Sequence, residues 1–217
     1  QVEIHLLGGC RLFVSGIERD LRYDKVRVLL AWLAMAPGAP QRREKLASLL
    51  WPDADEGAAR RSLRHALHVL RAALGEGGVQ LSTDRQAVHL AANTFRCDAA
   101  ELDAAQSRFS HGVGSTDDIV ALLAATSLYR GEFLAGIELD HDHELDSWLR
   151  HQREASVARA INLWRQLASV RLASGMAREA LEASRQLLEL SPLDAKANRT
   201  CIEMLAAVQG ADAALSH

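Results

Sequence analysis

The chain of 217 residues is 48% hydrophobic and only 5% aromatic, which predicts one large or two modest domains built from packed helices. Residues 1–96 contain 14 Lys and Arg against 10 Asp and Glu, whereas residues 97–217 contain 11 against 18, so any anionic partner is expected on the basic first half. The sequence shows no secretion signal, no apolar run of bilayer length and no cysteine spacing typical of disulfide or metal sites, which favours a cytoplasmic protein without membrane contact.

The first 21 residues predict a small antiparallel sheet. Apolar and polar residues alternate over Val2–Leu6, as they do in a strand with one buried face. Gly8-Gly9 supplies a tight turn, Arg11–Val14 is the expected return strand, and Ile17–Leu21 is a third short run.

Three helices should follow this sheet. The first is expected over Asp24–Met35 and ends before Pro37-Gly38. The second is expected over Arg42–Leu50 and ends at Trp51-Pro52, because proline cannot continue a helix. Asp55 is the expected N-cap of the third.

The third helix, Ala58–Leu74, combines a leucine seam with a cationic face. It contains no acidic residue, and Leu63, Leu67, Leu70 and Leu74 recur at three- and four-residue intervals on one stripe. Arginines and histidines occupy the other sides. A single basic helix often faces solvent without binding an anion. The elements on either side of it are therefore needed to interpret this helix.

A hairpin follows the third helix. Val79–Leu81 and Val88–Leu90 alternate as strands around the polar turn Ser82–Gln86. A sheet followed by three helices and a hairpin is the order of elements in a winged helix-turn-helix. In that fold the third helix enters the major groove of DNA.

The second half predicts a helical domain with a repeat. Helices are expected over Ala99–Phe109, Asp117–Tyr129, Asp146–Ser174, Ala177–Leu190 and Ala195–Val208. The spacing of a tetratricopeptide helix pair is matched by Trp164, Leu167, Ala168, Gly175, Ala180, Leu181 and Pro192. Because such pairs need neighbours to cover their apolar faces, we expect this domain to be truncated at its C-terminus, in a fragment of a longer protein.

Several stretches, spread over nearly the whole chain, carry a resemblance to one family. They are VEIHLLGGCRLFVSG, KVRVLLAWLA, REKLASLLWPDADEGAARRSLRHALHVLRAAL, STDRQAVHLAANTFRCDAAELDAA, LYRGEFLAGIEL, LDSWLRHQRE and ALEASRQLLELSPLDAKANR. The chain resembles the SARP-type bacterial transcriptional regulators, which join a response-regulator-like winged helix to a bacterial transcriptional activator domain of tetratricopeptide-like helices.

The resemblance implies a mainly α fold with a small β-sheet. A winged helix-turn-helix domain is expected over residues 1–96 and a tetratricopeptide-like bacterial transcriptional activator domain over residues 97–217. Double-stranded promoter DNA is the implied partner, while a homodimer, RNA polymerase and a fused downstream domain remain open as further partners. Val69 stands where family helices often carry a polar residue, and it could contact a thymine methyl or mark a surface for protein contact.

The candidate DNA contacts divide by position on the predicted helices and wing. The candidate base contacts lie on the outward face of the third helix and are Arg61, Arg64, His65 and His68. The candidate phosphate contacts lie on flanks, on the second helix or on the wing turn, and are Arg42, Arg43, Lys45, Arg60, Arg71 and Arg85.

No constellation predicts catalysis or a cofactor. A metal site is one interpretation of the neighbouring residues His141, Asp142, His143 and Glu144. Neighbouring residues in one loop, however, rarely converge on a single ion. We therefore expect no catalytic residues, no metal and no enzyme. The leading hypothesis is a sequence-specific DNA-binding transcriptional regulator. The alternative is an input or oligomerisation module that does not bind DNA and regulates a fused ATPase or signalling-enzyme domain.

Overall fold

The computed structural model describes the chain except for residues 76–80, 111, 113–114, 139–142 and 210–217. Its contacts group Gln1–Glu101 with Arg130–Glu154 as a first unit, and Leu102–Tyr129 with Ala155–His217 as a second. Residues 130–154 thus group with the first unit, although they follow residue 96, where the sequence predicts the domain boundary.

In the first unit, the N-terminal residues form the expected antiparallel sheet, and a fourth strand joins it. The strand order is β3 (Ile17–Arg19), β2 (Arg11–Val14), β1 (Val2–His5) and β7 (Arg96–Cys97), with β7 parallel to β1. Alternate residues of β1 are buried, as predicted, and β2 shows the same alternation; the buried residues are Val2, Ile4, Leu12 and Val14. Strand β7 was not predicted, because two residues cannot show a strand period.

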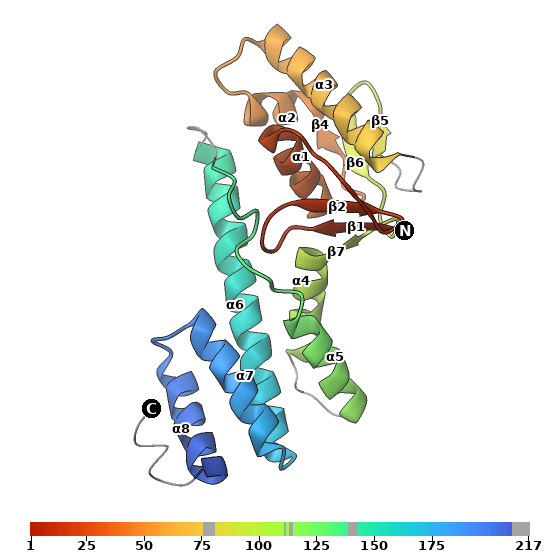
Figure 1. The fold of residues 1–217 in the computed structure, drawn as a ribbon. Helices are drawn as coiled ribbons and strands as arrows, with labels where there is room; N and C mark the ends of the chain where they lie inside the picture. The colour runs from red at the N-terminus through yellow and green to blue at the C-terminus, as the bar shows by residue number, and fades with distance from the viewer. Residues whose placement is uncertain (76–80, 111, 113–114, 139–142, 210–217) are drawn as a thin grey trace. The chain divides into compact units, whose positions relative to one another are not determined.

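The three expected helices pack against one another in the same unit. They are α1 (Asp24–Ala34), α2 (Arg43–Leu50) and α3 (Glu56–Leu74), and α3 contacts both others (Figure 1). The leucine seam is confirmed, because its four leucines are at most 4% exposed. Asp55 caps α3 as predicted, since its side chain accepts a hydrogen bond from the Ala58 amide at 2.8 Å.

The wing is a three-stranded sheet rather than a simple hairpin. Its order is β4 (Gln41–Arg42), β6 (Ala87–Leu90) and β5 (Leu81–Thr83). Arg42 therefore lies in a strand and is also the N-cap of α2, one residue before that helix begins. Its backbone pairs with Ala87 of β6, a long-range partner that helical periodicity cannot reveal.

The wing turn is also shorter than predicted. Ser82 and Thr83 belong to β5, where they pair with His89 and Val88 of β6, so the turn itself is Asp84–Gln86. Their polarity suggested a loop, but a strand with one exposed face accepts polar residues. The predicted strand residues Val79 and Gln80 lie outside the described residues.

The turn after β1 interlocks with the RGEFLAG segment that begins at Arg130. The Gly8 amide donates a hydrogen bond to the Glu132 carbonyl at 3.0 Å. A Cβ atom on Gly8 would lie 3.1 Å from the Arg130 carbonyl oxygen, and one on Gly131 would lie 3.1 Å from the Gly8 Cα. Both glycines have positive φ, so two glycines allow the backbones to meet here.

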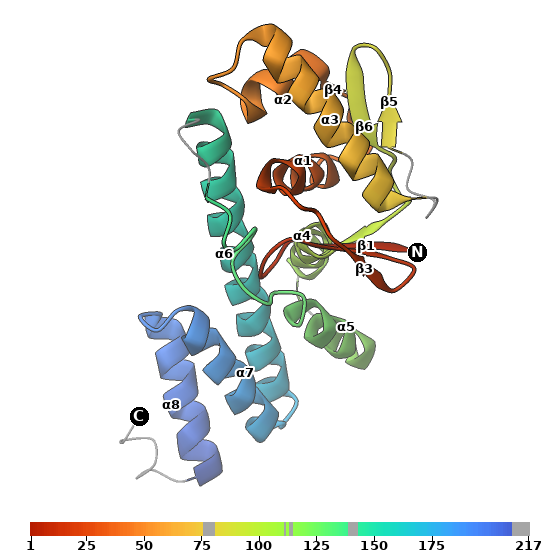
Figure 2. The same ribbon diagram turned by 45° about the horizontal axis from the view of Figure 1, so that its top comes forward.

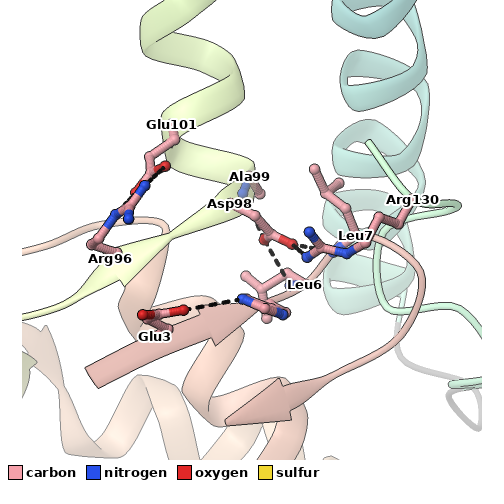
Figure 3. A network of polar contacts seen from close by, with 9 residues as sticks. Glu3, Leu6, Leu7, Arg96, Asp98, Ala99, Glu101 and Arg130 are labelled. Atoms are coloured by element: carbon pink, nitrogen blue, oxygen red, sulfur yellow. Dashed lines mark hydrogen bonds and ion pairs between the residues drawn. The ribbon is translucent and has the colours of Figure 1, made fainter. Parts of the chain in front are cut away.

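A buried carboxylate fixes the same junction (Figure 3). Asp98 is 4% exposed, and it accepts hydrogen bonds from the backbone amides of Leu6 at 2.7 Å, Leu7 at 3.2 Å and Ala99 at 2.7 Å. The Arg130 guanidinium donates to it at 2.6 Å. Burial raises the pKa of the Asp98 carboxyl, and these donors act in the opposite direction by stabilising its charge.

The second unit consists of helices. The helices that contribute to it are α4 (Asp98–Phe109), α5 (Thr116–Thr126), α6 (His143–Ala173), α7 (Ala177–Leu190) and α8 (Ala195–Gln209), of which α4 and α6 begin in the first unit. Four residues of the predicted repeat are buried, namely Leu167, Ala168, Ala180 and Leu181. None of the helices in the described residues is both long and apolar enough to cross a membrane.

Candidate nucleic-acid interface

The outward face of α3 presents all four candidate base contacts to solvent. Arg61, Arg64, His65 and His68 are exposed, on the side opposite the buried leucines. In the described part of the chain, the side chains of Arg61, Arg64 and His68 make no hydrogen bond or ion pair. This face therefore carries cationic and hydrogen-bonding groups that a ligand can engage without first breaking an internal contact.

Three of the candidate phosphate contacts gather around one cavity. Arg42 of β4, Arg43 of α2 and Arg85 of the wing turn line a cavity of about 490 Å³, together with Glu44. The Arg43 amide donates to the Gln86 carbonyl at 2.8 Å, which holds the start of α2 against the wing. Three guanidinium groups outnumber one carboxylate here, so the cavity favours an anion.

The wing turn is shaped by its own carboxylate. The Asp84 side chain accepts hydrogen bonds from the backbone amides of Gln86 and Ala87, both at 2.6 Å. These bonds lower the pKa of the Asp84 carboxyl, the Ala87 amide contributing most. Asp84 therefore closes the turn that carries Arg85, although its charge opposes an anion nearby.

Two flanking arginines of α3 connect that helix to its neighbours. Arg60 forms ion pairs with Glu56 on α3 and with Glu44 on α2, the second at 3.1 Å. Arg71 donates to the Thr83 hydroxyl at the end of β5 at 2.6 Å. Figure 2 shows α3 beside the β5–β6 hairpin that this second contact reaches. The α3 face, the α2 start and the wing thus belong to one surface.

Lys45 has a partner that the sequence did not suggest. Its ammonium group lies 2.9 Å from a carboxylate oxygen of Glu144, at the start of α6, and 5.9 Å from the centre of the Trp32 ring. The Trp32 ring packs against Trp148 of α6 at 4.8 Å, and Trp148 meets Phe133 edge-on at 5.7 Å. Lys45 is therefore directed toward the start of α6, within the first unit.

Residues 97–217, more than half of the chain, match the sequence model of the bacterial transcriptional activator domain. The chain belongs to this family. Its members are transcription regulators and not enzymes, so the resemblance to SARP-type regulators is confirmed. The search of curated proteins found no sequence that matches this chain.

The fold has a solved counterpart, Mycobacterium tuberculosis EmbR in complex with a low affinity phosphopeptide. The two structures match with a TM-score of 0.69 at 22% sequence identity, over 99% of this chain and 57% of the EmbR chain. The match confirms the mainly α architecture and shows that the chain spans little more than half the length of that relative.

Proposed function

We propose that the first unit binds double-stranded promoter DNA, with α3 in the major groove and the wing turn against the adjoining backbone. The observation that carries this proposal is the convergence of Arg42, Arg43 and Arg85 from three segments on one cavity. Guanidinium groups bind phosphate oxygens with two parallel hydrogen bonds, which gives both affinity and orientation.

The exposed α3 residues would then read bases. Arginine donates two hydrogen bonds to O6 and N7 of guanine, the most frequent specific contact in the major groove. Arg61 and Arg64 lie in the N-terminal half of α3, the part of a recognition helix that meets base edges. His65 and His68 extend the same face toward the C-terminal half, and the second unit would supply contacts to a second protomer or to RNA polymerase.

The test is a salt titration of DNA affinity for two arginine variants. The probes are a duplex selected by the protein from a random pool and a scrambled duplex of equal length. Arg64→Ala should cost about 1–3 kcal/mol on the selected duplex and little on the scrambled one. Arg85→Ala should weaken binding to both by similar factors and lower the salt slope by about one unit.

Arg199→Ala is the matched control, because Arg199 is an exposed arginine of the second unit. It should change neither the affinity nor the slope. Equal losses on both duplexes for Arg64→Ala would remove the base-contact role. Absence of salt-dependent binding to either duplex would overturn the proposal and favour the input or oligomerisation module.

A further inference from the structure

A cavity of about 550 Å³ lies in the first unit beside the outward face of α3. It is bounded by residues around the start of α1, by Trp51, which follows the end of α2, and by one side of α3. The lining residues are Tyr23, Lys25, Val26, Trp51, Arg61, Ser62, His65 and Ala66. The volume falls within the range of sites that enclose small molecules, roughly 300–1,000 Å³.

The walls of this cavity suit a flat apolar body. Val26 and Ala66 are 2% and 3% exposed and form apolar parts of the lining. Trp51 and Tyr23 add two aromatic rings, and Tyr23 is 53% exposed, so it leaves an aromatic surface uncovered. The Tyr23 ring lies 6.4 Å from the His65 ring, which extends the aromatic lining onto α3.

The charge of the lining suits an anion. Lys25 and Arg61 both line the cavity, and no Asp or Glu does. Each of three other cavities of similar size in the described residues includes at least one Glu among its lining residues. In the described part of the chain, the side chains of Lys25 and Arg61 are not engaged in ion pairs. The two cations are thus available to a bound carboxylate.

We propose that this cavity binds a small aromatic carboxylate, and that the ligand and DNA exclude one another. The aromatic body would lie against Trp51 and Tyr23, and the carboxylate would face Lys25 and Arg61. The exclusion rests on the proposed function, because Arg61 and His65 belong both to this cavity and to the face of α3 assigned to the major groove. A ligand that occupies these side chains removes them from DNA, which makes the cavity an effector site.

The first experiment uses protein without DNA, so it stands whether or not the chain binds DNA. The probe is 2-naphthoate, and the neutral control is 2-naphthalenemethanol, which has the same rings without the charge. Chemical-shift titration of the backbone amides should show 2-naphthoate bound with a Kd of about 1 mM or tighter, centred on Tyr23, Lys25 and Ser62. The neutral probe should bind at least about fivefold more weakly, because it lacks the charge interaction.

Three variants test the placement. Lys25→Gln should weaken 2-naphthoate binding about fivefold, whereas Lys196→Gln, a change at an exposed lysine of the second unit, should leave it unaltered. Ser62→Phe fills the cavity and should weaken binding at least about tenfold, with an unchanged amide spectrum elsewhere as proof of folding. Equal binding of both probes, or no binding at several millimolar, would overturn the site.

The second experiment measures DNA affinity with and without 2-naphthoate. At a ligand concentration of about five times its Kd, mutual exclusion weakens DNA binding about sixfold, and sodium acetate at equal concentration serves as the ionic-strength control. Ser62→Phe should lose this ligand effect. A ligand that binds at Lys25 and Ser62 but leaves DNA affinity unaltered would overturn the exclusion.

Discussion

The hydrogen bonds of the buried Asp98 carboxylate allow the loss of stability in an Asp98→Ala variant to be estimated. Asp98→Ala removes the acceptor of three buried backbone amides, those of Leu6, Leu7 and Ala99, and of the Arg130 guanidinium. Each buried amide left without an acceptor costs about 1–3 kcal/mol. Arg130 is 43% exposed and can be rehydrated, so it adds little. We expect a loss of about 3–5 kcal/mol, the lower part of the sum over these amides, because the variant no longer buries a charge.

The assay is urea unfolding followed by tryptophan fluorescence. Trp32, Trp51 and Trp148 lie in the first unit with Asp98, so the signal reports mainly on that unit. Fitting this transition by linear extrapolation gives its free energy of unfolding.

The matched control is an ion pair that starts from the same part of the chain but is exposed. The Arg96 guanidinium contacts the Glu101 carboxylate at 2.7 and 2.8 Å, with side chains 60% and 32% exposed (Figure 3). Glu101→Ala should cost about 0–1 kcal/mol, because water screens the pair and replaces the lost contacts. If Asp98→Ala cost no more than Glu101→Ala, the reasoning from buried donors would be refuted.

Three further changes test other parts of the fold. Gly131→Ala should destabilise the first unit by about 1–3 kcal/mol, because the residue has φ of 150° and its new Cβ would lie 3.1 Å from the Gly8 Cα; unchanged urea stability would contradict this. Leu167→Ala should cost about 2–5 kcal/mol in the second unit, since this side chain is fully buried; a loss within about 0.5 kcal/mol would mean a surface position. The pKa of Asp194 is lowered, chiefly by the Ala197 amide, so its charged form contributes stability above an ordinary carboxyl pKa of about 4 and loses it as pH falls. Asp194→Asn should therefore flatten the acid side of a pH series of unfolding free energies, and an unchanged acid slope would count against this contribution.

Local periodicity predicted the helices and much of the sheet. The leucine seam of α3 and the Asp55 cap depend on residues within a few positions of one another, so the sequence displays them directly. The short strands β4 and β7 depend on pairing partners more than 40 residues away, at Ala87 and Ile4. Two-residue strands have no period to recognise, and only the folded backbone shows them.

The candidate interface, too, could be predicted from the sequence only in part. The exposure of Arg61 and Arg64 follows from their angle relative to the leucines on a single helix, and the structure agrees. The gathering of Arg42, Arg43 and Arg85 requires the wing to fold back onto the start of α2, which helical periodicity cannot foresee. These residues were proposed as separate phosphate contacts, and their common cavity is a product of tertiary structure.

Lys45 shows why residue type alone is a weak guide to a phosphate contact. The sequence places it two residues after Arg43, on the same short helix, and suggests the same role for both. Helical geometry separates consecutive positions by about 100°, so two residues apart they point in different directions. Arg43 meets the wing at Asp84 and Gln86, whereas Lys45 meets Glu144 and the Trp32 ring. A phosphate near Lys45 would therefore meet the negative charge of Glu144, while three guanidinium groups line the wing cavity. For this reason the wing cavity, and not the exposed length of α2, is the stronger candidate for the first backbone contact.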